Sequence, residues 1–307
     1  ATTRDRGLAL GRPVLVSAPY YLDLHFPADM HYESDPELPQ AEWLALEDSM
    51  QKDPRLDHVA EGIEWTKQWR QGAVDFAGDI RVMGGEACLW SELVTPEVLP
   101  TRLWSRLPAV AERLWSAADC TDMDSFYSRL QSCWLCLPED PELTARRNLH
   151  ALGLSGAQVD IASLLEPVKW YGRLLGHQAL EARIAGSEMP KARPYAVTTP
   201  LDKVVDMLLP ESMAARRLDD LTLAASANRV QELLLGLGDQ TVVEELVPAI
   251  EALHRGAAIV ASYAGGDATR DATLAGLEAL DKPYGEYMAA PLVRWRWALS
   301  AEEASRD

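Results

Sequence analysis

The sequence predicts an α/β domain over residues 1–148 and an α-helical domain over residues 149–307. Two short apolar runs in the first part, at 14–17 and 80–83, are each followed by a segment with helical periodicity. From about residue 150 onward, apolar residues recur at spacings of three and four, the period of one helix face. With 307 residues, the chain is long enough to form two domains with separate cores.

The first domain is expected to alternate strands with helices. In chain order we expect a short helix ending near residue 10, a strand at 14–17, an irregular Pro-, Asp- and Glu-rich segment at 26–39, a helix around 57–70, a strand at 80–83 and a helix from about 105 to 115. Pro108 falls near the first turn of the last helix, where proline is tolerated because its missing N–H has no helical partner.

The second domain carries apolar stripes at helical spacing. The clearest stripe consists of Val243, Leu246, Val247, Ile250 and Leu253. Pro248 interrupts it and should kink or restart the helix, and the glycine-containing segments 236–239 and 265–267 predict turns. Because no segment shows strand alternation, we expect this domain to be all-α.

Two strand–helix units are compatible with a parallel sheet or with part of a (β/α)8 barrel. They cannot close a barrel alone, since a barrel has eight strands and about 250 residues. The chain alone would leave open strand edges, so we expect a partner segment. The chain also begins at Ala1 without an initiator Met, and we expect it to start within a longer protein.

Composition excludes several functional classes. A formal net charge of −18 would repel phosphate, so we expect no nucleic-acid partner and favour a neutral or cationic small ligand. No run of 18 apolar residues exists, and we expect no membrane span.

Cysteines and histidines show no metal-binding pattern. Cys133 and Cys136 form one CxxC without a second cysteine pair or a nearby histidine pair, which favours buried thiols or one local disulfide over zinc. His25 and His31 follow the first strand, where they could line a cleft or be solvated. We expect neither a metal nor a cofactor.

The two strand ends carry the same combination of side chains. Trp90 and Glu92 follow the second strand at a spacing of two, which places both side chains on one side of an extended segment. Tyr21 and Asp23 follow the first strand at the same spacing. A flat ring packs on the C–H face of a sugar, and a carboxylate accepts hydrogen bonds from hydroxyls. One sugar pocket is therefore predicted, with packing at the strand ends as the alternative.

Three motifs resemble the last third of a β-N-acetylhexosaminidase of glycoside hydrolase family 20. They are Ser-Ala-Pro-Tyr-Tyr-Leu-Asp at 17–23, Gly-Gly-Glu-Ala-Cys-Leu-Trp-Ser-Glu at 84–92, and Arg-Leu-Trp at 102–104 with 106–116. The resemblance covers roughly residues 8–118, and the helical remainder is similar to the C-terminal extension of proteobacterial members. It implies the C-terminal portion of a (β/α)8 barrel, with the two strands as the seventh and eighth. A periplasmic or secreted location would suit such a bacterial enzyme.

The resemblance also implies a role for each predicted site residue. Family members remove terminal N-acetylglucosamine or N-acetylgalactosamine with retention, and the acetamido oxygen of the substrate is the nucleophile. Tyr21 would be the catalytic residue that holds the acetamido carbonyl. Asp23 would accept from a sugar hydroxyl near O6, Trp90 would wall the acetamido group, and Glu92 would bind O4. Independently of the resemblance, Glu112 and Arg113 are adjacent on a predicted helix, and we expect them to form an ion-paired architectural element rather than a site.

One part of the family pattern is missing from the chain. The general acid and the acetamido-orienting acid of the family form an Asp-Glu step, and no such step occurs in these 307 residues. Gly265-Gly266-Asp267 imitates its beginning, but Ala268 follows, and we interpret the segment as a turn. We therefore expect the acid pair on an upstream segment with the first six barrel strands, and the chain alone to be inactive.

Two other functions remain open. The chain could be a catalytically inactive saccharide-binding or regulatory relic that kept the pocket and lost the acid. The helical domain could instead serve as an assembly module.

Overall fold

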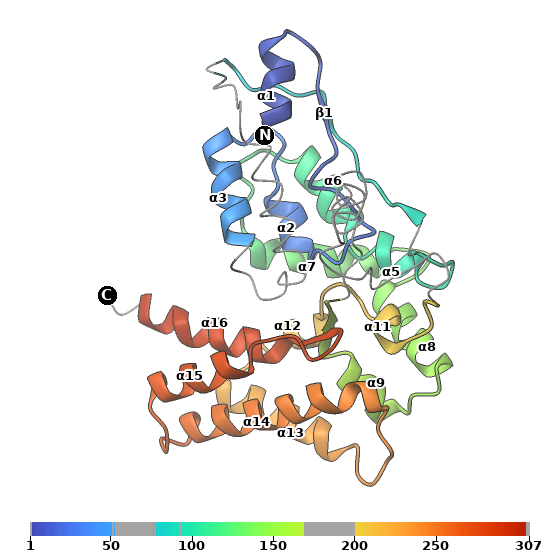
Figure 1. Ribbon diagram of the computed structural model, residues 1–307, viewed down its shortest axis with the longest axis vertical. Coiled ribbons are helices and arrows are strands. Elements are labelled where there is room, and N and C mark those ends of the chain that lie inside the picture. The colour runs from blue at the N-terminus through green and yellow to red at the C-terminus, as the bar shows by residue number, and fades with distance from the viewer. Residues whose placement is uncertain are drawn as a thin grey trace, which may run out of the picture. The chain divides into compact units, whose positions relative to one another are not determined.

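The computed structural model describes residues 2–50, 52, 76, 78–91, 94–168 and 200–304 (Figure 1). It divides into two compact units, one within residues 1–140 and one formed by 141–168 with residues from 202 onward. The helix expected around 57–70, and Glu92, lie outside the described residues.

The first unit contains short strands and helices in alternation. Its described elements are α1 (Thr2–Ala9), β1 (Leu15–Val16), α2 (Ala28–Glu33), α3 (Gln40–Met50), β2 (Gly84–Gly85), α5 (Leu99–Leu103), α6 (Leu107–Trp115) and α7 (Met123–Trp134). The helices predicted to end near residue 10 and near residue 115 are confirmed. The segment at 26–39 is not irregular throughout, because α2 forms there and buries Ala28, Met30, His31 and Tyr32.

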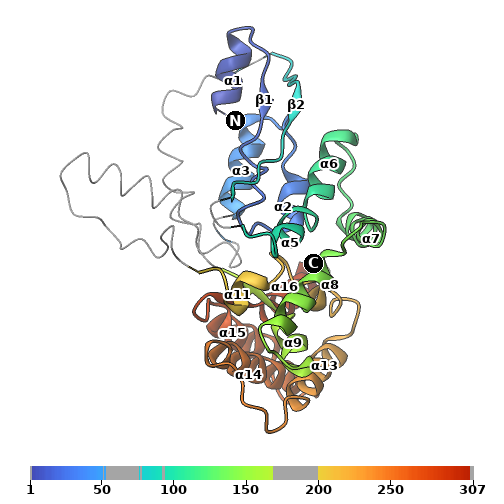
Figure 2. The same ribbon diagram turned by 90° about the vertical axis from the view of Figure 1, so that its right-hand side faces the viewer.

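The two strands pair in parallel, as the alternation of strands and helices predicted (Figure 2). Leu15 aligns with Gly84 and Val16 with Gly85. The second strand thus begins just after the predicted run 80–83, although the backbone N–H of Met83 still donates to the Val14 carbonyl at 2.8 Å. A Cβ at Gly85 would lie 2.7 Å from the Tyr20 ring, so the pair forms where glycine permits this close approach.

Helix α6 packs against the segments that continue the two strands. Tyr20, Leu22 and Val110 form a buried cluster. The partly buried residues packed against this cluster are Ala87, Leu89, Leu103, Leu107 and Leu114. Leu107, Val110 and Leu114 recur at spacings of three and four, so they form the apolar face of α6.

The second unit is mainly helical. Its described elements are α8 (Pro141–Ala151), α9 (Gly156–Ala162), β3 (Leu165–Pro167), α11 (Val204–Met207), α12 (Met213–Arg216), α13 (Leu223–Leu235), the 3-10 helix η4 (Glu244–Leu246), α14 (Val247–Ala264), α15 (Arg270–Leu280), β4 (Tyr287–Ala289) and α16 (Ala290–Ala304). The all-α expectation is wrong, because β3 and β4 pair in antiparallel orientation. Each strand has three residues, all buried, so neither shows an alternation that a sequence pattern could reveal.

The turn predictions for the second unit are confirmed. Pro248 restarts the chain as a helix, because it lies in the first turn of α14 directly after η4. At the other end of α14, Gly266 has a φ of 84°, its N–H donates to the Tyr263 carbonyl, and the Asp267 N–H donates to the Ser262 carbonyl. These two bonds are those of a Schellman motif, so segment 265–267 is a helix end. Among the described residues, no helix is both long and apolar enough to cross a membrane.

Candidate active site

Tyr21 continues the parallel pairing beyond β1. It forms a parallel bridge with Cys88, in which the Leu22 N–H donates to the Cys88 carbonyl at 2.7 Å. The Cys88 N–H in turn donates to the Tyr20 carbonyl at 2.9 Å. The two segments that follow β1 and β2 therefore run side by side, and their next residues emerge at the same edge. In open and closed parallel sheets, this carboxyl edge is where ligand-binding residues gather.

Asp23 and Trp90 meet at this edge. The backbone N–H of Trp90 lies 3.5 Å from Oδ1 of Asp23, the long limit of a hydrogen bond. Trp90 is 44% exposed, while Tyr21 and Asp23 are half-buried. The structure thus brings Asp23 and Trp90 together, and it places Tyr21 in the same segment, paired with Cys88. The fourth predicted site residue, Glu92, lies outside the described part of the chain. Asp23 and Trp90, a carboxylate and an exposed indole ring, are in contact at this edge, a combination that suits the polar and apolar faces of a sugar.

Buried side chains fix the segment that carries Tyr21 and Asp23. His31 of α2 donates from Nδ1 to the Pro19 carbonyl at 3.0 Å, as its buried neutral ring allows. The Tyr20 hydroxyl donates to the Ser34 carbonyl. Tyr20 has no exposed surface, and burial above all raises its pKa. Tyr20 is therefore a packing residue.

Arg106, directly before α6, holds the same segment from its other end. Its guanidinium is 1% exposed and donates to the carbonyls of Leu22 and Leu24, and also to the Phe26 carbonyl at 3.1 Å. No role of this residue is predicted from the sequence. A signal was present, however, because a cation at a helix N-terminus opposes the helix dipole and has to be explained by another contact.

The interpretation of the two loop histidines as solvated is wrong. His25 is 3% exposed and His31 has no exposed surface. Burial, followed by the nearby charge of Arg106, lowers the pKa of His31 to about 3, while the Pro19 carbonyl and Asp29 act in the opposite direction. His31 is therefore neutral at physiological pH. The sequence missed this burial because the two residues lie in and before a helix that was not predicted.

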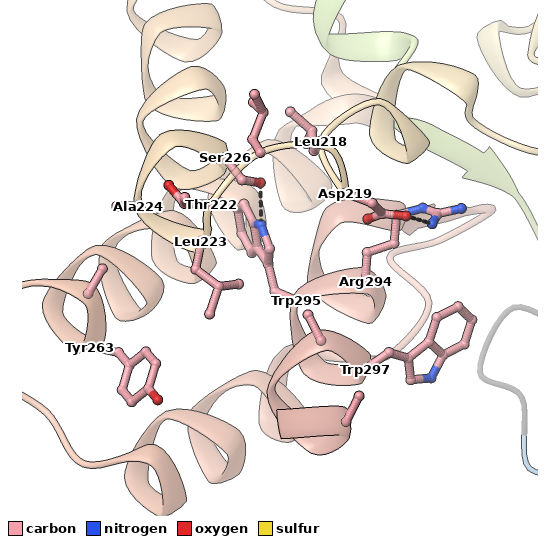
Figure 3. Close-up of a pocket in the computed structure, with 14 residues that line it drawn as sticks. Leu218, Asp219, Thr222, Leu223, Ala224, Ser226, Tyr263, Arg294, Trp295 and Trp297 are labelled. Atoms are coloured by element: carbon pink, nitrogen blue, oxygen red, sulfur yellow. Dashed lines mark hydrogen bonds and ion pairs between the residues drawn. The ribbon is translucent and has the colours of Figure 1, made fainter. Parts of the chain in front are cut away.

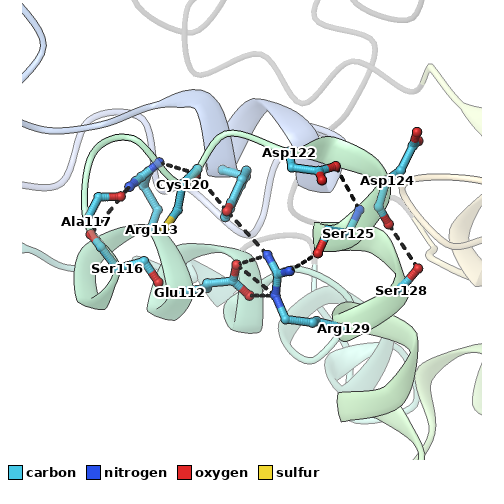
Figure 4. A network of polar contacts seen from close by, with 11 residues as sticks. Glu112, Arg113, Ser116, Ala117, Cys120, Asp122, Asp124, Ser125, Ser128 and Arg129 are labelled. Carbon is cyan, nitrogen blue, oxygen red and sulfur yellow. Dashed lines mark hydrogen bonds and ion pairs between the residues drawn. The ribbon is translucent and has the colours of Figure 1, made fainter.

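Glu112 and Arg113 are architectural, as predicted, but each pairs with a different partner. Glu112 on α6 accepts from Arg129 on α7, with 3.1 Å between Oε2 and Nε (Figure 4). This bond is the main reason that the pKa of Glu112 is lowered. Arg113 lies over the Tyr32 ring at 5.3 Å and within 3.7 Å of Asp35.

Arg113 also closes the C-terminal end of α6. It donates to the carbonyls of Ala117 at 2.6 Å and Cys120 at 3.1 Å. A hollow of about 670 Å³ lies beside this network. Because it adjoins the C-terminal end of α6, at the other end of the helix from Arg106, we interpret it as part of the scaffold.

A second hollow of about 730 Å³ lies in the helical unit (Figure 3). At its wall, the Trp295 indole N–H donates to Ser226 Oγ at 2.6 Å, which joins α16 to α13. Arg294 pairs with Asp219, whose pKa is raised by burial and lowered to a lesser extent by Arg294. These contacts connect α16 to α13 and to the turn after α12, and no ligand is predicted for this surface from the sequence.

The cysteines form no disulfide, so the expectation of a local bridge is wrong. Cys133 is partly buried in α7, and Cys136 in the following turn is exposed, so the alternative of buried thiols does not hold for Cys136. Within the described ranges, no group of His, Cys, Asp and Glu has the geometry of a metal site.

The segment that carries this site matches a known catalytic domain. Residues 5–118 match the profile described as "Glycosyl hydrolase family 20, catalytic domain". The family resemblance is confirmed. The human beta-hexosaminidase subunit beta is 36% identical over 130 residues, which cover 41% of this chain and 17% of that protein. The corresponding subunit of Entamoeba histolytica is 35% identical over 116 residues, or 38% of this chain and 18% of that protein.

A solved structure resembles nearly the whole chain. The chitobiase of Flavobacterium johnsoniae aligns with a TM-score of 0.65 at 20% identity, covering 97% of this chain and 42% of that one. This likeness concerns the fold, and it confirms an α/β architecture related to the barrel with substantial helical content. The match to the curated relatives spans less than a fifth of their length.

Proposed function

We propose that the chain is the C-terminal portion of a family 20 β-N-acetylhexosaminidase. It would supply the last two barrel strands, part of the sugar pocket and a helical C-terminal domain. The observation that carries this proposal is the contact between Asp23 and Trp90 at the ends of two adjacent parallel strands. These residues lie in the segment that matches the catalytic domain of the family.

The proposed reaction is hydrolysis of terminal, non-reducing N-acetylglucosamine or N-acetylgalactosamine with retention. Tyr21 would donate a hydrogen bond to the acetamido carbonyl and hold its oxygen for attack on the anomeric carbon. The exposed face of Trp90 would pack on the acetamido group, which would exclude water there. Asp23 would accept from a hydroxyl near O6, and Glu92, two residues after Trp90, would accept from O4. Each contact orients the sugar for attack by its own oxygen.

The proton donor would come from an upstream segment. Protonation of the leaving oxygen needs a positioned acid, and the sequence contains no Asp-Glu step to supply the acid pair of the family. In the described residues, β1 and β2 pair only with each other. The large apolar side chains of Leu15 and Met83 are 51% and 74% exposed beside this pair. Six further strands would cover these edges and side chains in a complete barrel.

The direct test compares the chain with the complete enzyme on p-nitrophenyl N-acetyl-β-glucosaminide. We expect no hydrolysis above background by the 307 residues alone, because the acid is missing. We expect turnover when the upstream segment is present, either in one polypeptide or as an added chain. Full activity of the isolated chain would refute the proposed location of the acid.

The absence of the Asp-Glu step also favours one alternative, a saccharide-binding relic of the family. In that case the pocket would bind N-acetylglucosamine, and the complete protein would show no turnover. Calorimetric binding together with a negative hydrolysis assay of the complete protein would support the relic.

A further inference from the structure

Arg106 contacts the backbone on both sides of a proposed sugar-binding residue. Its guanidinium donates to the carbonyls of Leu22 and Leu24, the residues directly before and after Asp23. We propose that Arg106 is a positioning residue, which holds the Asp23 carboxylate where it can accept from the sugar hydroxyl. The inference rests on the proposed function and extends it to a residue that contacts no substrate.

The strand ends and Arg106 together leave Asp23 little freedom. The Leu22 N–H is bound to the Cys88 carbonyl at 2.7 Å, and the Leu22 carbonyl is bound by Arg106. Each residue has only two soft backbone torsions, so fixing the groups on either side of Asp23 restricts the direction of its side chain. The Trp90 N–H also lies 3.5 Å from Oδ1 of Asp23, the long limit of a hydrogen bond, so this contact holds the carboxylate only weakly.

The same guanidinium connects this loop to the helical layer. Nη2 of Arg106 also donates to the Arg102 carbonyl in α5 at 2.9 Å, and Nη1 donates to the Phe26 carbonyl at 3.1 Å. Four carbonyls therefore share one buried side chain. Arginine presents five N–H donors in a planar fork, whereas lysine has three donors on one atom and cannot reproduce this pattern.

The test is a double-mutant cycle in the complete enzyme. We expect Arg106→Lys and Asp23→Asn each to lower kcat/KM by roughly 10- to 100-fold, the range for losing a hydrogen bond to a charged group. If Arg106 acts through Asp23, the double variant should be no worse than Asp23→Asn alone, because coupled residues are non-additive. The proposal would be overturned if the fold-losses in kcat/KM of the two single variants multiplied in the double variant. An unchanged kcat/KM of Arg106→Lys would overturn it as well.

Arg113→Lys is the matched control. Arg113 is 4% exposed and also donates to backbone carbonyls, but these lie at the other end of α6. We expect this variant to lower the melting temperature and to remain additive with Asp23→Asn. Coupling of the same size at Arg113 would show a general loss of structure and would refute a specific role of Arg106.

A substrate that lacks the 6-hydroxyl gives a second measurement. The wild-type enzyme should prefer the normal substrate over its 6-deoxy analogue, Arg106→Lys should lose this preference, and Arg113→Lys should keep it. If Arg106→Lys does not fold, the neutral variant Arg106→Gln takes its place in the same measurements. If neither variant folds, Arg106 is required for stability, and the proposal is overturned. An inactive wild-type enzyme would instead remove the proposed function and this inference with it.

Discussion

His31 and Arg106 both bind backbone carbonyls in the segment that carries Tyr21 and Asp23. They do so in different charge states, since one is a buried neutral ring and the other a buried cation. The positive charge of Arg106 helps to keep His31 neutral. The Pro19 carbonyl accepts from His31, and the carbonyls of Leu22 and Leu24 accept from Arg106, so the two side chains fix different parts of the segment.

This arrangement predicts a pH-dependent stability. His31 has a pKa of about 3 in the fold and an ordinary value near 6.5 in the unfolded chain. Between pH 6.5 and pH 3, the unfolded chain binds a proton at His31 that the folded chain does not bind. The contribution of His31 to the free energy of unfolding is therefore complete above pH 6.5 and is lost as the pH falls towards 3. The slope from this one group should approach about 1.4 kcal/mol per pH unit.

Urea denaturation at pH 7, 6, 5 and 4 measures this effect. His31→Asn keeps an N–H donor near the Pro19 carbonyl and removes the titrating ring, so it should flatten the pH dependence. The control is His150→Asn, because the exposed His150 makes a similar contact to the Leu154 carbonyl. An equal slope in wild type and His31→Asn would show that the ring does not control acid stability.

At the scale of elements, the strand pair depends on two glycines. Gly84 has a φ of 135°, which non-glycine residues rarely adopt. A Cβ at Gly85 would lie 2.7 Å from Tyr20, 2.9 Å from Leu114 and 3.0 Å from the Val16 carbonyl. The glycine at 85 thus lets β2 approach both its partner strand and α6.

We expect Gly85→Ala to separate β2 from these neighbours. The clash involves backbone and packed side chains, so the cost should be in the range of an overpacked core, about 1–3 kcal/mol. Urea denaturation measures the loss, and hydrolysis by the complete enzyme should fall because Trp90 follows β2. Gly156→Ala is the control, since its Cβ would meet no atom within 4 Å. Equal stability of both variants would refute the close approach.

The sequence predicted best those elements that have one buried and one exposed face, because only these show a periodic apolar pattern. Helix α6 has one buried face and was anticipated within two residues, and Tyr21, Asp23 and Trp90 were placed at strand ends that the structure brings together. Strands β3 and β4 were missed because every residue in them is buried. Arg106 was missed because it binds backbone carbonyls, and a sequence pattern records side chains rather than the carbonyls they contact.

At the scale of the whole molecule, the exposed apolar side chains near β1 and β2 predict where an upstream segment would bind. Met83 is 74% exposed, although its own N–H belongs to the strand pairing. A glutamate there would place a charge in the proposed interface and cost little in the isolated chain. Buried unpaired charges are costly, so the complex would bear most of the loss.

Reconstitution from two separately produced segments measures this effect. We expect Met83→Glu to leave the melting temperature of the 307-residue chain nearly unchanged. The same variant should need at least about 10-fold more upstream segment to reach half-maximal hydrolysis, which corresponds to about 1.4 kcal/mol of binding. Leu235→Glu is the control, because Leu235 is 76% exposed at the end of α13 in the helical unit. If both variants reconstitute as wild type does, the strand-edge surface does not bind the upstream segment, and the barrel would have to be completed through another face.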